Sequence, residues 1–176
     1  MLRGTIISFA MQTSTPILLL AAALACASPP AAAQERIFIQ VPALMAPGAK
    51  VDPDVLAECN LPALVARQVL QKVHERHPHA VAFDPSTPAP AQFIRIQILA
   101  ATMVSGVGMR QIFVRAEVVQ NDLIIASVRF NDRTSASPGM GLRLCDVMDH
   151  VAEGIGKRVA LWADTSFGQA IPASMK

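Results

Sequence analysis

The segment that most constrains the fold is Gln111–Asn131, in which two alternating stretches of apolar residues flank a short polar sequence. Alternation at every second residue is typical of β-strands with one buried face, so this segment predicts a β-hairpin. A shift in pairing by one residue would move every side chain to the opposite face of the sheet. The two apolar faces coincide when Val118 pairs with Ile124, which predicts a three-residue loop, Gln120–Asp122, with its second or third residue in the left-handed region.

Four further segments have the periodicity of regular secondary structure. Alternating apolar residues predict strands over Arg36–Leu44 and Phe93–Val104, whereas apolar residues three or four apart predict helices over Asn60–His77 and Arg143–Ala163. The segment Asp132–Gly141 is rich in Ser and Gly and predicts a flexible link. The order β-α-β-β-β-α predicts an α+β domain with a four-stranded, mostly antiparallel sheet and two helices packed on one face.

Proline and glycine residues refine these boundaries. Pro42 is expected to end the first strand or to place it at an edge of the sheet. Asp52–Glu58 is predicted to form a short helical turn, because proline is tolerated at a first helical position. Ala80–Gln92 is rich in proline and is expected to be a loop. Gly154 and Gly156 interrupt the last helix and are expected to allow its close approach to the sheet or to the first helix.

Three segments of this architecture, Ile94–Leu99, Ile112–Val128 and Val147–Val159, have the pattern of a strand, a hairpin and an amphipathic C-terminal helix. In them the chain resembles small bacterial envelope proteins related to the N-terminal domain of TolB and to CsgG-type domains. The resemblance implies an envelope-assembly or accessory role. It supplies no functional residue, and a cysteine pair is not part of the general pattern.

The N-terminal part of the chain predicts export. Ile17–Ala33 is an apolar run followed by small residues, and Arg3 provides a weakly positive start, as in a secretory signal peptide. The run is too short for a transmembrane helix, which needs about 20 apolar residues. We therefore predict a signal peptide over residues 1–33 and a single periplasmic domain over residues 34–176, of which residues 164–176 form a flexible tail.

Two alternatives remain open for this N-terminal part. Translation starts at Met1 or at Met11, and the second choice removes the only basic residue of the leader. In a lipoprotein, Cys26 would become the lipidated first residue and would attach the protein to a membrane. The residues before Cys26 match the expected pattern for lipidation poorly, so a soluble exported protein is favoured.

Cys59 and Cys145 are the cysteines left after cleavage of the predicted leader. In an oxidising compartment a widely spaced pair of this kind favours a disulfide over a metal site. The bridge would join the starts of the two predicted helices. The alternative is two separate buried thiols.

Charge and motifs exclude several functions. The net charge of the whole chain is only +2, which does not indicate nucleic-acid binding. The chain has no G-x-S-x-G nucleophile motif, and we expect neither catalysis nor a cofactor.

Two clusters of residues are candidate chemical sites. His74, His77 and His79 are ligand types for late transition metals, although Pro78 separates the last two and a polar helix end explains them equally well. An acidic cluster in the last helix allows a small hydrolase as the weakest alternative. Its members are Asp146, Asp149, His150 and Glu153.

The strongest candidate for a binding surface is the face of the sheet turned away from the helices. The predicted register places Arg95, Arg115 and Arg129 on this face, with Phe113 directly opposite Arg129 as a cation–π pair. Arginine and aromatic residues are enriched at protein interfaces. The sequence therefore predicts an envelope accessory protein that binds another protein, or a second copy of itself, through this open face.

Overall fold

The fold is described for residues 36–104, 109–135 and 143–167 of a computed structural model. All of these residues belong to one compact unit, Gln34–Lys176. The predicted signal peptide, including Cys26, lies outside the described residues. In chain order the elements are β1 (Phe38–Gln40), β2 (Leu44–Val51), α1 (Pro53–Glu58), α2 (Leu61–Arg76), β3 (Val81–Phe83), β4 (Gln92–Val104), β5 (Met109–Gln120), β6 (Leu123–Ser135) and α3 (Leu144–Phe167).

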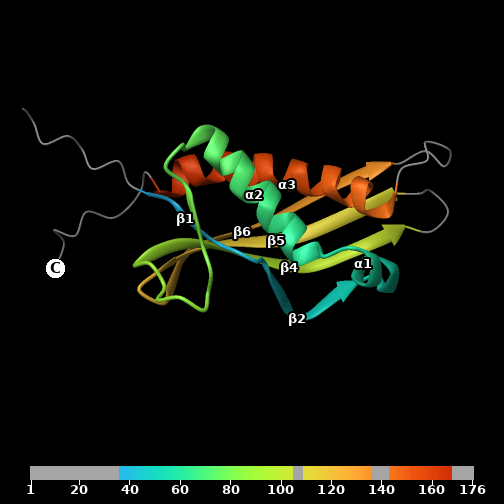
Figure 1. The fold of residues 1–176 in the computed structure, drawn as a ribbon, viewed down its shortest axis with the longest axis horizontal. Helices are drawn as coiled ribbons and strands as arrows, with labels where there is room; N and C mark the ends of the chain where they lie inside the picture. The colour runs from blue at the N-terminus through green and yellow to red at the C-terminus, as the bar shows by residue number, and fades with distance from the viewer. Residues whose placement is uncertain (1–35, 105–108, 136–142, 168–176) are drawn as a thin grey trace, which may run out of the picture. The chain divides into compact units, whose positions relative to one another are not determined.

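A six-stranded sheet forms one layer of the domain, with the path β3-β1-β4-β5-β6 and with β2 paired to β4 beside β1. The long strands β4, β5 and β6 form an antiparallel meander, whereas β1 and β2 run parallel to β4 (Figure 1). The predicted α+β class is confirmed, and the predicted number of four strands is wrong.

The two additional strands come from segments that contain proline. Pro42 lies between β1 and β2, so the predicted strand Arg36–Leu44 is divided and its second part continues to Val51. Proline has no N–H group and cannot continue a ladder of hydrogen bonds, but the chain re-enters the sheet directly after it. In the expected loop Ala80–Gln92, three residues form β3 by pairing with β1, from Phe38↔Val81 to Gln40↔Phe83. Such short pairings depend on a neighbouring strand and leave little signal in their own sequence.

The β5–β6 hairpin has a two-residue turn instead of the predicted three-residue loop. Asn121 and Asp122 have φ values of 48° and 65°, as two-residue hairpin turns require. Val119 pairs with Ile124, and a bulge then shifts the register so that Val118 pairs with Ala126. Because the bulge inserts one extra residue into β6, it restores the apolar residues of β6 to the same face as those of β5. The predicted faces are therefore correct from Ala126 onward. Ile124, which was predicted on the apolar face with Val118, instead pairs with Val119 and is 52% exposed, and the predicted loop and pairing are wrong.

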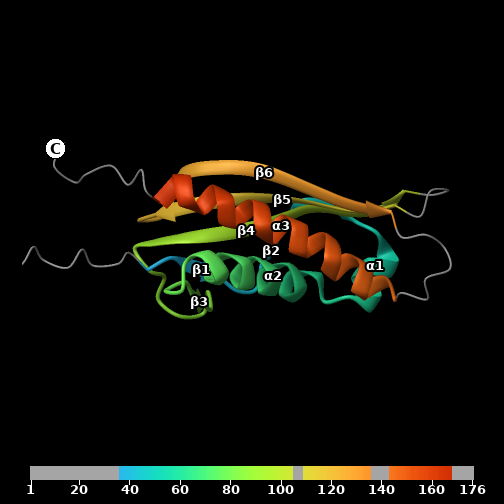
Figure 2. The same cartoon turned by 90° about the horizontal axis from the view of Figure 1, so that it is seen from above.

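The helices α2 and α3 lie side by side on one face of the sheet (Figures 1 and 2). The Asn60 side chain caps α2 by accepting a hydrogen bond from the Ala63 amide, and His77 ends this helix, close to the prediction. Helix α3 continues to Phe167, which is buried, so the start of the predicted tail, residues 164–167, is helical instead. No helix in the described part of the chain has the length and apolar character needed to cross a membrane.

The core fills the space between these helices and the sheet. Its largest fully buried side chains include Ile39 of β1, Ile94 and Ile96 of β4, Ile112 of β5 and Met148 of α3. Burial of side chains of this size stabilises the fold by about 2 kcal/mol each.

Both predicted close approaches of α3 occur. A Cβ atom at Gly156 would lie 2.6 Å from the main-chain oxygen of Gln68 in α2. A Cβ atom at Gly154 would overlap the carboxylate of Asp132 in β6. One glycine therefore brings α3 against α2, and the other brings it against the sheet.

Candidate functional site

The candidate site is the sheet face opposite α2 and α3, which we call the outer face (Figure 1). Successive side chains of a strand point to opposite faces, so the residues between the buried core positions define it. Arg95, Glu117 and Ser127 form one row across β4, β5 and β6. The next row contains Gln97, Arg115 and Arg129. The structure therefore places the three predicted arginines on one face.

A buried ion pair organises the centre of this face. Glu117 is only 2% exposed, and its Oε2 accepts a hydrogen bond from Nε of Arg95 at 2.8 Å and lies 2.7 Å from Nη2 of the same residue. Nη1 of Arg115 lies 3.9 Å from the other carboxylate oxygen. A buried carboxylate is tolerated only when it is paired and hydrogen-bonded. Glu117 therefore holds the side chain of Arg95 in a defined position.

Arg115 and Arg129 lie directly opposite each other on β5 and β6. The predicted pairing of Phe113 with Arg129 is wrong, because Phe113 lies opposite Asn131. The hairpin turn and its bulge together displace the pairing by two residues, which preserves the face of each side chain but changes its neighbour. Like charges directly opposite each other in a sheet are destabilising. This arginine pair consequently costs stability unless an anionic group lies nearby.

Phe113 and Arg129 nevertheless line the same hollow, which has a volume of about 480 Å³. A bulge in β4 between Ile98 and Ala100 lies beside it. The remaining lining residues are Leu99, Ala100, Phe130 and Asn131. The outer face thus combines an apolar depression with guanidinium groups at its margin.

Sequence reasoning missed Arg133 as a member of this face. It pairs with Gln111 of β5, two positions beyond the Phe113–Asn131 pair, and is exposed. The signal was present, because the alternation of half-buried and exposed residues in β6 continues through Thr134. The Ser- and Gly-rich sequence that follows led to the prediction of a link from Asp132 onward.

The three histidines of the predicted metal cluster do not converge. Nε2 of His77 lies 2.7 Å from Oδ1 of Asp164 in α3, whereas Nδ1 of His74 lies 3.4 Å from the main-chain oxygen of Ala80. Across residues 36–104, 109–135 and 143–167, no group of three His, Cys, Asp or Glu side chains is arranged to hold a metal ion. The structure therefore adds no support for the metal-binding alternative.

Asp149 and Glu153, two members of the predicted acidic cluster, form ion pairs with basic residues of α2 and α3. Asp149 accepts hydrogen bonds from Arg67 at 2.7 Å and from Gln68 at 2.8 Å, both in α2. Glu153 contacts Lys157 at 3.0 Å and Lys72 at 3.4 Å. Hydrogen bonds from these lysines, that of Lys157 first, lower the pKa of Glu153. These two carboxylates connect α3 to α2, which is a structural role.

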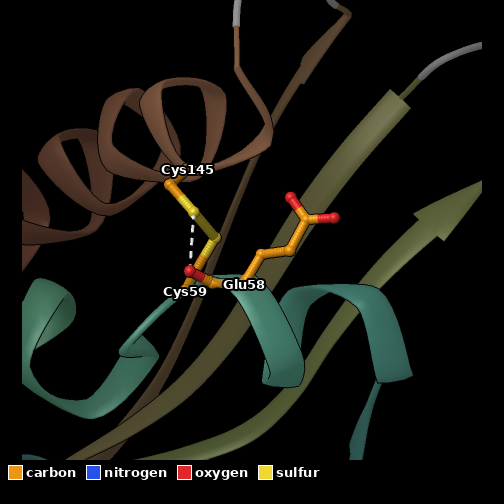
Figure 3. Close-up of a disulfide and its surroundings, with 3 residues drawn as sticks. All are labelled: Glu58, Cys59 and Cys145. Atoms are coloured by element: carbon orange, nitrogen blue, oxygen red, sulfur yellow. Dashed lines mark hydrogen bonds between the residues drawn. A yellow bond between two sulfur atoms is a disulfide. The ribbon is translucent and has the colours of Figure 1, made fainter.

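Cys59 and Cys145 form a disulfide with a Cα–Cα distance of 5.5 Å (Figure 3). The bridge joins the residue between α1 and α2 to the first turn of α3, as predicted. Sγ of Cys145 also lies 3.3 Å from the main-chain oxygen of Glu58. The bridge borders a groove of about 520 Å³, which Asp146 and Arg67 also line.

Comparison with known proteins identifies the fold alone. No family model matches the chain, and no curated protein matches it by sequence. The solved structure of protein XCC0632 from Xanthomonas campestris, a DUF330 protein, is similar, with a TM-score of 0.55 and 13% identity over 80% of this chain and 91% of that one. The hypothetical protein CT253 from Chlamydia trachomatis is also similar, with a TM-score of 0.53 and 13% identity over 74% of this chain and 96% of that one.

Proposed function

We propose that the protein is an exported accessory protein of the bacterial cell envelope and that it acts by binding another protein through the outer face. The observation that carries this proposal is the pair of arginines, Arg115 and Arg129, that lie directly opposite each other beside the hollow containing Phe113. The sequence pattern of residues 1–33 and the Cys59–Cys145 disulfide support export.

The arrangement of charges supports a role in binding. The opposed arginine pair is only partly compensated in the free protein, because the Glu117 carboxylate 3.9 Å from Arg115 is shared with Arg95. An acidic group on a partner would complete the compensation. Arginine and large aromatic residues supply most of the binding energy in protein interfaces. Because Glu117 already fixes Arg95, part of the surface is ordered before binding, and less conformational entropy is lost on association.

The same charges favour an acidic partner over the outer face of a second copy of the protein. Arg95, Arg115, Arg129 and Arg133 outnumber Glu117, which is buried and already paired. Two such faces stacked on each other would bring like charges together, and electrostatic complementarity selects against such contacts. Homodimerisation through this face stays a prediction that the following experiment also tests.

The test is charge reversal on the outer face. The variant Arg115→Glu/Arg129→Glu should lose at least about tenfold in capture of envelope partners, measured by crosslinking in the native envelope with mass spectrometry. A matched control, Arg143→Glu/Lys157→Glu, reverses two exposed charges of the helix layer and should capture the same partners as the wild type. Circular dichroism should show the same fold for all three proteins. Equal capture by the outer-face variant would overturn the proposal.

A further inference from the structure

β6 is the terminal strand of the sheet and presents a long free edge. From Ala126 to Ser135 it pairs with β5 residue by residue without a break. In the described part of the chain no strand pairs with its other side. This continuous stretch spans about 33 Å, given the rise per residue of a strand. It therefore exposes a row of main-chain N–H and C=O groups along one side of the domain.

The usual protections of an edge strand are weak in β6. Natural sheets block their edges with short strands, charged side chains, proline, bulges or inward-pointing charges. Of these, β6 carries the exposed charged side chains Arg129 and Arg133, which oppose a second basic strand but not an acidic one. β6 has 13 residues and no proline, and its bulge lies at the hairpin end, outside the continuous stretch. Its one inward-pointing charge, Asp132, is half-buried and contacts Arg158 of α3 at 3.4 Å. The edge is thus open to pairing with another extended chain.

The two faces of β6 differ in chemistry. On the outer face, Arg129 and Arg133 are exposed, and neither forms an ion pair with a carboxylate of the described residues. On the helix face, Val128 and Phe130 are half-buried, and the ring of Phe130 lies 6.3 Å from that of Trp162 in edge-to-face geometry. A strand added to β6 would meet cations on one face and apolar side chains on the other.

We infer that β6 binds an extended segment of a partner protein as an added strand, with acidic side chains on the outer face and apolar side chains on the helix face. Main-chain hydrogen bonds would supply affinity, and the alternating side chains would supply specificity. This inference rests on the proposed function of the outer face and adds the strand edge as the place where the partner attaches.

Charge complementarity distinguishes this occupant from a second copy of β6. The outer-face residues of the continuous stretch are Ser127, Arg129, Asn131, Arg133 and Ser135, without a carboxylate. Two copies of β6 paired edge to edge would place arginines beside arginines with no compensating acid. An acidic strand instead neutralises Arg129 and Arg133 and also approaches Arg115 across the opposed pair.

The exposed start of β6 adds an apolar anchor next to this edge. Leu123, Ile124 and Ile125 are 69%, 52% and 47% exposed. Contiguous exposed apolar residues of this kind mark interaction sites. We therefore expect the partner segment to extend toward the hairpin turn with apolar side chains.

Synthetic peptides test the inference on the full, disulfide-bonded protein. A fluorescent peptide of about ten residues that alternates Glu and Val should bind, as measured by anisotropy, and its Lys/Val counterpart should bind at least about tenfold more weakly. N-methylation of alternate residues removes the hydrogen-bond donors along one edge of the peptide. Of the two possible N-methylated Glu/Val peptides, one should lose at least about tenfold in affinity and the other should bind like the parent.

Charge-reversal variants test the contribution of the two β6 arginines to peptide binding. Arg129→Glu/Arg133→Glu should reverse the preference from the Glu/Val to the Lys/Val peptide, whereas the control Arg143→Glu/Lys157→Glu should keep the wild-type preference. Equal affinities of the two N-methylated peptides, or no binding of the Glu/Val peptide, would overturn the inference. Sedimentation showing a wild-type dimer that the Glu/Val peptide dissociates would also overturn it, because β6 would then be occupied by a second copy. If envelope capture still depends on Arg115 and Arg129 in any of these cases, the proposed function stands without the added strand.

Discussion

Glu117 shows how a single residue determines the order of the outer face. It is the one charged residue in the buried part of the described chain, and Arg95 is its close partner. Desolvation of a carboxylate costs several kcal/mol unless its partners compensate. The pair therefore adds little net stability, but removing one member alone leaves the other buried without compensation. The chain thus retains a costly group where a hydrophobic residue would suffice for folding, which is consistent with a surface that needs fixed guanidinium groups.

Removing only Arg95 should therefore destabilise the protein strongly. Arg95→Met leaves Glu117 buried with only the distant Arg115, and we expect the free energy of unfolding to fall by about 3 kcal/mol. Arg95→Met/Glu117→Met replaces both partners by apolar side chains and should restore most of that loss. Urea unfolding of the wild type, both single variants and the double variant measures the coupling. Equal stabilities of the single and double Arg95 variants would contradict this account.

At the residue level, sequence reasoning placed the three arginines on the correct face, but it gave Arg129 the wrong neighbour and placed Ile124 on the wrong face. Alternation identified Arg95, Arg115 and Arg129 on one face, because this property depends only on the period of two. The neighbour of Arg129 depends on the turn and on the bulge at the Val118–Val119 position, and both are set by tertiary packing that the local sequence does not show. The burial of Glu117 likewise depends on residues from three strands.

At the level of elements, the two long helices were predicted almost completely because their signals are local. Asn60, Pro62 and Pro78 mark the limits of α2, and apolar spacing identifies α3. The last turn of α3 was missed because its partners lie elsewhere in the sequence. Asp164 in this turn forms an ion pair with Arg76 and contacts His77 at 2.7 Å, both at the end of α2.

The ion pairs between α2 and α3 predict a dependence of stability on acid. A hydrogen bond from Arg76, and then one from His77, lowers the pKa of Asp164 below its ordinary value of about 3.9. Because the folded-state pKa is depressed, the contribution of Asp164 is fully present above the ordinary value and is lost as the pH falls through the folded-state pKa. The pKa values of Glu75 and Glu153 are lowered as well, by hydrogen bonds from Lys72 and Lys157 respectively.

The variant Asp164→Asn tests this contribution. It should lower the melting temperature by a few degrees at about pH 7, and the difference from the wild type should be smaller at about pH 3, because protonation of the carboxylate at low pH removes the contribution of the ion pair. Leu161→Gln, a substitution at an exposed position of the same helix, serves as the control and should give a difference that does not vary with pH. A loss of stability in Asp164→Asn that is equal at both pH values would show that the ion pair is not responsible.

At the level of the whole molecule, the disulfide connects the two helices at the end where both begin. α2 starts two residues after Cys59, and α3 starts one residue before Cys145, so the two positive helix ends lie next to each other. Parallel helices with adjacent positive ends repel weakly, and Asp146 and Asp149 near this end of α3 reduce that repulsion. The bridge holds this end of the helix layer together, whereas the arginines of the outer face belong to the meander of β4, β5 and β6.

This separation predicts that loss of the disulfide weakens the fold without changing the outer face. Cys59→Ala/Cys145→Ala should lower the free energy of unfolding by about 4 kcal/mol, because the unfolded chain regains the freedom of a long closed loop. Amide hydrogen exchange should increase at the start of α2 and α3, while β5 and its pairing with β4 keep their protection. Intact mass of the wild-type protein, before and after reduction and alkylation, verifies that the bridge forms. Two freely alkylated thiols in exported protein, or equal loss of protection in β5 and in the helix starts, would show that the helix layer and the sheet do not depend on the bridge in this way.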